Sequence, residues 1–507
     1  MSFISQSYAL LIVATVGIYW FLGRSLNLKW GILLAVSLIF YASLQIYYLP
    51  LLLGITWLNF WLGKIMENNV MQVGVEAKNP QLSNRDWEEL QDFWQRRTTK
   101  ILCVGIVINV LLLLGFKYIP FILNSLAALL NLPQISQSAS WLSENLIAPL
   151  GISFFTFECI AYLIDVYRGA PASRHLLQFT SYKLFFPKLI SGPITRYHNF
   201  STQANYLQFP NADQLTEGLW LIACGAVKKA LIADHLAIFV DLAFGNLERA
   251  GSGDLWLAVL AYGLQLYFDF SGYVDLACGS ALLLGFKLPQ NFNFPYFSSS
   301  IAAFWRRWHI TLGDWLRNYL YFPLGGSRQG LAKTCLNLLI VMLIAGIWHG
   351  AAWGYIVWGI VHGIALVIHR LTETMSQRWQ LLAKFWQTAL GILLAWLLTQ
   401  AMVFFSWIFF RLPNLSQATL VLQHFWSYGG DVQFTQKVYQ EAMGLERYHV
   451  TILVFAVVLL MNLTYWSQQK LKLQLNWPLK LALVPLCLFA VSLFAPQGGL
   501  PYIYFDF

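Results

Sequence analysis

The sequence contains little charge. Asp, Glu, Lys and Arg make up 11% of its 507 residues, whereas 58% of the residues are apolar and 16% are aromatic. Soluble domains contain about 25% charged residues, so the composition excludes this class and predicts an integral membrane protein. A spanning helix needs about 20 apolar residues, which leaves room for about 10 to 12 spans. We therefore predict an all-α fold, a polytopic transmembrane helical bundle that forms a single domain over 1–507.

The sequence also lacks several motifs of common enzymes. It has no GxSxG elbow, no HExxH, no Walker A loop and no GxGxxG after a strand. Its six cysteines show no CxxC pair or zinc-type spacing, so we expect buried thiols, no metal site and no disulfides. We expect no bound cofactor either. The cysteines are Cys103, Cys159, Cys224, Cys278, Cys335 and Cys487.

The net charge of +9 arises from 32 Lys and Arg residues against 23 Asp and Glu residues. They are spread between apolar stretches, as is typical of loops that face the anionic cytoplasmic surface of a membrane. Nucleic acid is therefore not an expected partner. The apolar run from Tyr8 to Leu22 has no basic start and no small-residue cleavage pattern, so we interpret it as a first span and not as a signal peptide.

Three connections differ from the apolar segments. In 64–100, six basic and six acidic residues accompany apolar residues at helical spacing, which predicts an extramembrane amphipathic loop. A polar loop is expected over 411–448, and a re-entrant segment over 171–212. Between these connections, membrane spans are expected at 8–23, 30–63, 101–123, 146–167, 215–244, 255–286, 334–369, 385–411, 449–466 and 478–495.

The segment 301–320 is too polar to span lipid alone. As one continuous helix it would separate an apolar face from a polar face, with His309 on the aromatic side. Two interpretations are compatible: the aromatic and basic residues anchor the helix at the membrane interface, or they wall a slot that attracts phosphate or carboxylate. A histidine on that face either bonds across a helix interface or takes part in catalysis. The residues concerned are Trp305, Arg306, Arg307, Trp308, Asp314, Trp315 and Arg317.

The segment 334–369 has no charged residue but contains three histidines. The glycines from Gly346 to Gly363 predict a helix face that packs closely against a neighbour. His349, beside Trp348, is a functional candidate because ionisable residues within membranes are costly to bury. Burial keeps an imidazole neutral near pH 7, which is the form that a general base requires. His362 and His369 lie nearer the segment's end, where we expect interfacial solvation.

With these motifs the chain resembles the membrane-bound O-acyltransferase (MBOAT) family, in the bacterial branch of alginate O-acetylation and, more distantly, of teichoic acid D-alanylation. The resemblance covers about 1–370, and the ending PYIYFDF resembles the family's C-terminal signature. It implies the MBOAT fold. The motifs are PLGISFFTFECIAYLIDVYRG at 149–169, FFPKLISGPITR at 185–196, LYFDFSGYVDLA at 266–277, FWRRWHITLGDWLRNYLYFPLGG at 304–326 and GIWHG at 346–350.

The resemblance implies a catalytic core over 301–369. His349 matches the presumed catalytic histidine of the family's WHG motif, and His309 matches a second active-site histidine. One position departs from the pattern, because relatives typically read WLRDYLY where this chain has Asn318. If that carboxylate orients a histidine in relatives, its role here is taken by Asp314, one turn earlier, or is absent.

The resemblance implies transfer of an acyl group, most simply acetyl, from a cytoplasmic thioester such as acetyl-CoA or an acyl-carrier thioester. The acceptor would be a hydroxyl of an exported or cell-envelope polysaccharide, reached directly or through a periplasmic acetyltransferase partner. Membrane lipids of the bacterial inner membrane would surround the chain. In this hypothesis His349 is the base, His309 polarises the carbonyl or positions the acceptor, tryptophans including Trp348 wall the slot, and the arginines steer the anionic donor.

Two alternatives remain open from the residues alone. The first is a transporter or channel in which His309, His349, Asp269 and Asp275 line a pathway, although no internal repeat supports it. The second is a non-catalytic scaffold of an envelope-modifying complex. The density of Lys and Arg in 64–100 and in 301–333 predicts that both segments lie on the cytoplasmic side.

Overall fold

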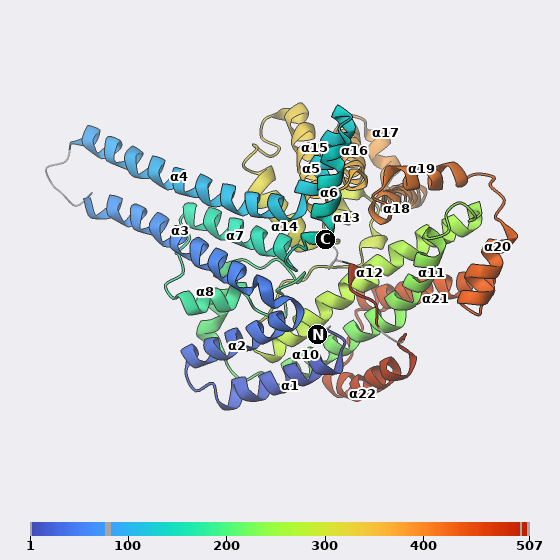
Figure 1. Cartoon of the computed structure of the whole chain (residues 1–507), viewed down its shortest axis with the longest axis horizontal. Coiled ribbons are helices and arrows are strands. Elements are labelled where there is room, and N and C mark those ends of the chain that lie inside the picture. The colour runs from blue at the N-terminus through green and yellow to red at the C-terminus, as the bar shows by residue number, and fades with distance from the viewer. Residues whose placement is uncertain (1–2, 77–82, 497–498, 504–507) are drawn as a thin grey trace. The chain divides into compact units, whose positions relative to one another are not determined.

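The computed structural model describes residues 3–76, 83–496 and 499–503, and every regular element in these ranges is a helix (Figure 1). This confirms the predicted all-α class. Part of the predicted 64–100 loop, residues 77–82, lies outside the described residues. So do residues 504–507 of the C-terminal signature.

The helices form two compact units, and each is described by itself. Unit 1 comprises Met1–Leu215 and Ser280–Pro289, and unit 2 comprises Thr216–Gly279 and Gln290–Asp506. The helices of unit 1 are α1 (Gln6–Phe21), α2 (Leu26–Gln45), α3 (Leu49–Glu76), α4 (Asn84–Lys117), α5 (Ile119–Leu130), α6 (Pro133–Asn145), α7 (Ile152–Tyr167), α8 (Leu176–Lys183) and α9 (Tyr197–Gln203), with short 3₁₀ turns η1 (Ile46–Tyr48) and η2 (Ala204–Tyr206).

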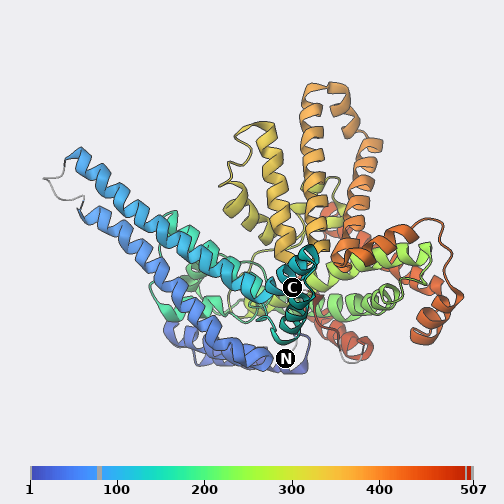
Figure 2. The same cartoon turned by 45° about the horizontal axis from the view of Figure 1, so that its top comes forward.

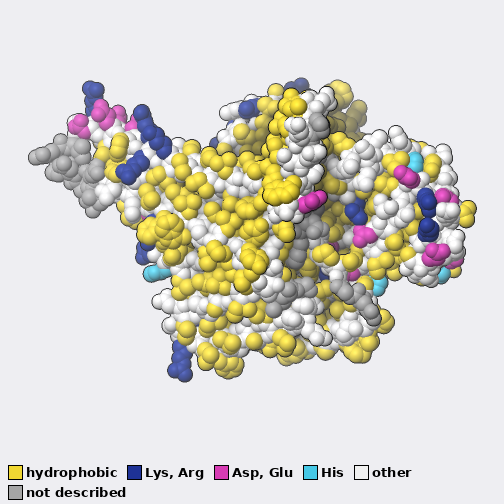
Figure 3. Space-filling model, in the orientation of Figure 1, with side chains coloured by type: hydrophobic (Ala, Val, Ile, Leu, Met, Phe, Trp, Pro, Cys, Tyr) yellow, Lys and Arg dark blue, Asp and Glu magenta, His cyan; other side chains and the backbone are white. Residues whose placement is uncertain are grey.

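An antiparallel hairpin of α3 and α4 contains the predicted amphipathic loop. Ser83 caps α4 through a capping box with Asp86, and the helix then continues without a break from its charged first half into an apolar second half. Figure 3 shows the result, with acidic and basic side chains near the tip of the hairpin and hydrophobic side chains along the rest. The loop and the following span are therefore one helix, because no residue between them terminates it.

A buried ionic network shapes the centre of unit 1. The Glu158 carboxylate of α7 accepts bonds from the Lys188 ammonium at 2.6 and 2.7 Å, from Lys183 at 3.3 Å and from the Thr195 N–H at 3.1 Å. Buried charges are tolerated when they are paired and hydrogen-bonded in this way. The network ties the irregular segment after α8, which carries the FFPKLISGPITR motif, to α7.

Unit 2 contains the two histidine motifs. Its elements are α10 (Ala212–Ala226), the π-helix η3 (Val227–Ala233), α11 (Asp234–Phe244), α12 (Ser252–Leu283), η4 (Pro295–Phe297), α13 (Ile301–Trp305), α14 (Ile310–Leu316), the π-helix η5 (Arg317–Tyr321), α15 (Gly330–His349), α16 (Trp353–Arg378), α17 (Gln380–Gln387), α18 (Ala389–Arg411), α19 (Leu415–His424), α20 (Val432–Phe434), the π-helix η6 (Thr435–Ala442), α21 (Arg447–Tyr465), the π-helix η7 (Trp466–Lys470) and α22 (Trp477–Phe494).

The predicted segment 334–369 is a pair of helices, α15 and α16, that turn back on each other after Gly350. Figure 2 shows them with α18, side by side and coloured from gold to orange. A methyl group on Gly346 would overlap the Tyr355 carbonyl oxygen, and one on Gly359 would lie 2.5 Å from the Met342 carbonyl oxygen. The glycines therefore allow the close packing that the spacing predicted, but between two helices of the same segment.

Seven helical segments in the described ranges are long and apolar enough to cross a membrane, and the first contains both α2 and α3. α1 and α5 are shorter apolar helices. The seven candidate spans are Leu26–Gln72, Asn84–Lys117, Gly330–His349, Trp353–Arg378, Ala389–Arg411, Arg447–Lys470 and Trp477–Phe494.

The expectation that all six cysteines are buried was wrong: Cys159 is buried, but Cys103 is exposed on α4 and the others are half-buried. Apolar segments in a membrane present side chains to lipid, so an apolar sequence context does not predict burial within the protein.

Candidate active site

The segment 301–320 is not the single helix that its hydrophobic pattern predicted. α13 ends at Trp305, and His309 has φ of +43° in the left-handed region before α14 begins. The break is held by the preceding strand-like segment, since the Ile310 N–H donates to the Asn291 carbonyl at 3.0 Å and the Asn291 side chain accepts two bonds from Thr311. A left-handed non-glycine residue costs about 1–2 kcal/mol, and such strain concentrates at functional sites.

His309 is completely buried at this break, as its place on the aromatic side predicted. Its ring lies 4.9 Å from the Phe270 ring of α12 and 6.2 Å from the Trp348 ring of α15, both edge-on. The residue lies outside the candidate spans, and burial lowers its pKa to about 3. His309 is therefore neutral at physiological pH.

His349 is the last residue of α15 and is 2% exposed. Three aromatic rings contact it edge-on, with centroid distances of 4.9 Å to Trp348, 5.0 Å to Trp358 of α16 and 5.0 Å to Phe410 of α18. The C-terminal end of a helix favours a positive charge. This position therefore offsets part of the cost of forming an imidazolium ion in an apolar box.

The two predicted histidines meet at one side chain. The Trp348 ring contacts His309 at 6.2 Å and His349 at 4.9 Å, so a single indole lies against both imidazoles. They come from different elements, 40 positions apart in the chain. The structure brings together the pair on which the sequence-based hypothesis depends.

A third histidine joins this cluster, which corrects the expectation of interfacial solvation for His362. The side chain is completely buried, and its Nε2 lies 2.9 Å from the Ser406 hydroxyl of α18. That hydroxyl donates to the Val403 carbonyl at 2.6 Å, so it must accept from His362, and Nε2 carries the proton. The Trp358 ring lies 4.7 Å from His362 and also contacts His349, which links the third histidine to the second.

The sequence did contain a signal for His362. Trp358 and His362 are four residues apart on α16, on the side that carries Gly359 and Gly363, and this side packs against α15. A histidine on the glycine-rich face of a helix should have been assigned to the interior. The position of His362 near the end of the apolar run was a weaker indicator of its environment than its place on this helix face.

The tryptophans of the 301–320 motif reach the same cluster in part. The Trp305 ring lies 5.3 Å from His362 and 5.8 Å from Trp358, and the Trp308 ring lies 5.1 Å from Trp407 of α18. Trp315 is instead buried against Tyr319 at 5.4 Å. Phe270, Trp407 and Phe410 complete the aromatic walls. Phe270 lies within the LYFDFSGYVDLA motif, whereas Trp407 and Phe410 come from a segment without a motif, and nothing local in the sequence indicated that any of the three contacts this cluster.

The charged residues of the motif lie at its edge. Arg306 is exposed and its Nε donates to the Ala302 carbonyl at 3.2 Å, while Arg307 is half-buried. Asp314 forms an ion pair with Arg317 at 2.7 Å, and both side chains are about half exposed. Asp314 therefore binds an arginine and does not orient a histidine.

The carboxylates of α12 that the transporter alternative invokes are paired with lysines of η3. The Asp269 carboxylate lies 2.7 Å from the Lys229 ammonium and accepts the Ile503 N–H at 3.0 Å, and Asp275 lies 2.6 Å from Lys228. Paired in this way, they hold helices and the C-terminal segment together. These contacts give both carboxylates a structural role, which was one of the two interpretations of this cluster.

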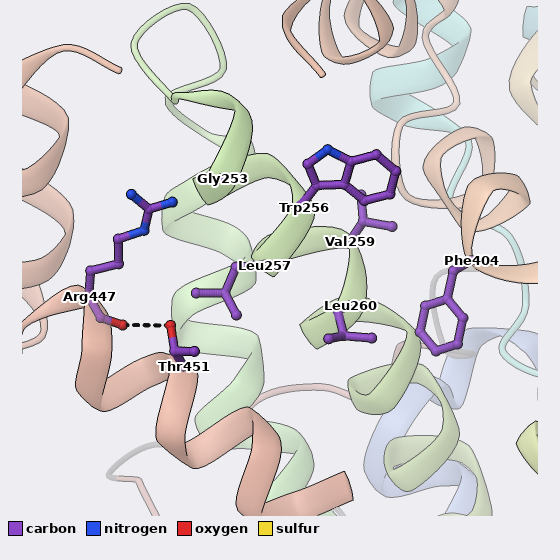
Figure 4. A pocket seen from close by; sticks show the side chains of 8 residues that line it. All are labelled: Gly253, Trp256, Leu257, Val259, Leu260, Phe404, Arg447 and Thr451. Atoms are coloured by element: carbon purple, nitrogen blue, oxygen red, sulfur yellow. Dashed lines mark hydrogen bonds between the residues drawn. The ribbon is translucent and has the colours of Figure 1, made fainter. Parts of the chain in front are cut away.

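A cavity of about 420 Å³ lies elsewhere in unit 2, where α12, α18 and α21 meet (Figure 4). Its lining is mostly apolar, and Figure 4 shows Trp256 and Phe404 on one side and Arg447 on the other. The Arg447 guanidinium is paired with Asp254 at 3.2 Å. None of the histidines lines this cavity, so we do not assign it to catalysis.

In the described part of the chain, no group of three or more His, Cys, Asp or Glu side chains is arranged to hold a metal ion.

Comparison with known proteins identifies the family of the chain. The profile of the family described as "MBOAT, membrane-bound O-acyltransferase family" matches residues 42–410. The protein named "Probable alginate O-acetylase AlgI" of Pseudomonas putida is 38% identical over 448 residues, which cover 88% of this chain and 83% of that protein. "Peptidoglycan O-acetyltransferase" of Helicobacter pylori is 35% identical, covering 77% and 72%.

A more distant relative is "Teichoic acid D-alanyltransferase" of Streptococcus thermophilus, 34% identical over 45% of this chain and 58% of that protein. The family match includes both histidine motifs and the helices that wall them. The chain therefore belongs to the membrane-bound O-acyltransferase family and is an O-acyltransferase that crosses the bacterial inner membrane several times.

Proposed function

We propose that this protein transfers an acetyl group from a cytoplasmic thioester to hydroxyl groups of an exported or cell-envelope polysaccharide. The relatives named for alginate and for peptidoglycan support this acceptor class, because both names specify a polysaccharide and an O-acetyl transfer. The observation that carries the proposal is the contact of one indole, Trp348, with both His309 and His349 in a buried aromatic cluster.

In the proposed step, the His349 imidazole takes the proton of the acceptor hydroxyl while the oxygen attacks the thioester carbonyl carbon. The new C–O bond forms, the C–S bond breaks, and the departing sulfur receives the proton from the His349 imidazolium. No electrons are exchanged with a cofactor. A neutral imidazole at the end of a helix suits both halves of this transfer, because it accepts a proton first and donates it later.

His309 has a different role in this proposal. Burial keeps it neutral, so it donates one N–H bond without carrying charge, and such a donor polarises a thioester carbonyl or positions the acceptor. Trp305, Trp308 and Trp348 exclude water, which limits hydrolysis of the thioester. The exposed Arg306 and the half-buried Arg307 supply positive charge for the phosphates or acidic surface of the donor.

The test uses the full-length protein in detergent with acetyl-CoA labelled in the acetyl group. Alginate, peptidoglycan fragments and a neutral glucan are offered separately, each with and without extract of the periplasm as a source of a relay protein. We expect label in an acidic or amino-sugar polysaccharide and release of one thiol for each acetyl group transferred. Thiol release without a labelled sugar in any arm, or no thiol release at all, would contradict the proposal.

A further inference from the structure

A second cavity lies in unit 1 and has a different chemical character from the active site. It measures about 500 Å³ and is bordered by one face of α3, the start of α2 and the segment that enters α8. Its walls combine aromatic with basic side chains and include no carboxylate. The lining residues are Asn27, Trp57, Phe60, Trp61, Lys64, Arg174, His175, Leu176 and Leu177.

The α3 face of this cavity has the pattern of a membrane interface. Trp57, Trp61 and Lys64 are separated by four and three residues, so they lie on one side of the helix in successive turns. Trp57 is 54% exposed and Trp61 44% exposed, within the candidate span Leu26–Gln72. Tryptophans followed by a lysine are typical of the depth at which lipid tails meet headgroups.

Two basic side chains, Lys64 and Arg174, belong to the lining of the cavity. The Lys64 ammonium lies over the Phe60 ring at 4.9 Å and over the Trp61 ring at 5.7 Å, so the basic group lies directly beside the aromatic side chains. Lys64 and Arg174 form no ion pair with a described side chain. The nearby Glu67 carboxylate accepts the Ala172 N–H at 3.0 Å and is not part of the lining. The cavity therefore presents net positive charge.

The start of α8 adds to this charge. No side chain caps the helix at His175, and the first two residues, Leu176 and Leu177, line the cavity. The first N–H groups of a helix have no partner within it and carry a partial positive charge. These donors reinforce the neighbouring lysine and arginine, which remain the main attraction for an anion.

We propose that this cavity binds the headgroup phosphate of an anionic phospholipid, with Lys64 and Arg174 on the phosphate and the acyl chains along Trp57 and Trp61. A soluble phosphate would need the basic side chains alone. The exposed tryptophans within a candidate span favour a ligand that has an apolar part in the membrane. The site shares no residue with the histidine cluster, and it links the enzyme to the lipid composition of the leaflet around it.

The test compares binding of phosphatidylglycerol with that of phosphatidylcholine to the full-length protein by native mass spectrometry from detergent. The first variant carries Lys64→Gln and Arg174→Gln. The matched control carries Arg85→Gln and Lys100→Gln on the exposed hairpin, which changes the net charge equally. Each basic side chain near an anionic surface contributes about fivefold, so we expect about 25-fold weaker binding of phosphatidylglycerol in the first variant and less than twofold change in the control.

A second variant, Trp57→Ala with Trp61→Ala, keeps the charges and tests the apolar part. We expect it to weaken the binding of phosphatidylglycerol although both basic side chains remain. Selectivity for phosphatidylglycerol that survives Lys64→Gln with Arg174→Gln would overturn the proposal. Displacement of the lipid by inorganic phosphate or by CoA at equal concentration would also overturn it, because the site would then bind a soluble anion. Both variants are accepted only if their melting temperatures stay within a few degrees of the parent.

Discussion

Replacing His349 with glutamine distinguishes a catalytic base from a residue that is needed only for packing. Gln keeps a polar side chain of similar reach but cannot take up a proton at neutral pH. A general base contributes about 10²- to 10⁴-fold to the rate. We therefore expect His349→Gln to lower thiol release from acetyl-CoA by at least 100-fold while the affinity for the donor changes little.

The cost in stability follows from the contacts of His349. Its three edge-on aromatic contacts, at 4.9, 5.0 and 5.0 Å, are each worth about 0.5–1.5 kcal/mol, and a Gln side chain recovers part of this by packing against the same rings. We expect a net loss of about 1 kcal/mol, which corresponds to a fall of a few degrees in melting temperature. The variant should therefore insert, purify as a single species and remain folded in the assay.

The assay measures thiol release and labelled product at saturating donor, with melting temperature recorded on the same sample. The matched control is His198→Gln, which makes the same change at an exposed histidine of α9 and should keep full activity. Full activity of a folded His349→Gln protein would refute the assignment of His349 as the base. Loss of activity that is accompanied by unfolding would refute the argument that this side chain is not needed for packing.

Further outcomes are expected at His309, at the two arginines and at Ser406. His309→Gln should keep measurable activity, because a hydrogen bond to a carbonyl is partly replaced. It should also lose less stability than the parent on acidification. Burial lowers the pKa of His309 to about 3, so the neutral ring costs the folded state no stability above about pH 6.5, and below that pH the free energy of unfolding of the parent falls by up to about 1.4 kcal/mol per pH unit. Equal acid sensitivity of the two proteins in melting curves would argue against a buried neutral ring. Arg306→Ala and Arg307→Ala should raise the KM for donor several-fold with little change in kcat, most clearly at low salt, and a normal KM in both would leave them as interfacial anchors. Ser406→Ala should lower stability by about 1–2 kcal/mol, because the N–H of His362 loses its buried acceptor, and an unchanged melting temperature would contradict the assigned tautomer.

Several properties were predictable because they depend on residues close together in the chain. The scarcity of charge predicted the membrane class, and several of the expected spans coincide with helices long and apolar enough to cross a membrane, whereas those at 146–167, 215–244 and 255–286 do not. The charged hairpin tip followed from composition alone. His309 and His349 stood out because an ionisable group in apolar sequence must be buried at a cost, whatever surrounds it.

Other properties depend on segments far apart in the chain. The helical wheel of 301–320 failed because Asn291 and Asn293 bond to its backbone and force a break at His309. The turn after Gly350 folds one apolar run into two helices and so buries His362 against Ser406 of α18. Phe270 of α12 and Phe410 of α18 contact the histidines across the fold, and neither the motif around Phe270 nor the sequence around Phe410 indicates these contacts. The sequence determined which groups could carry the chemistry, because polarity and charge are local. Only the tertiary structure decided which of them meet, because a ring contact or a helix break depends on partners that the chain supplies from elsewhere.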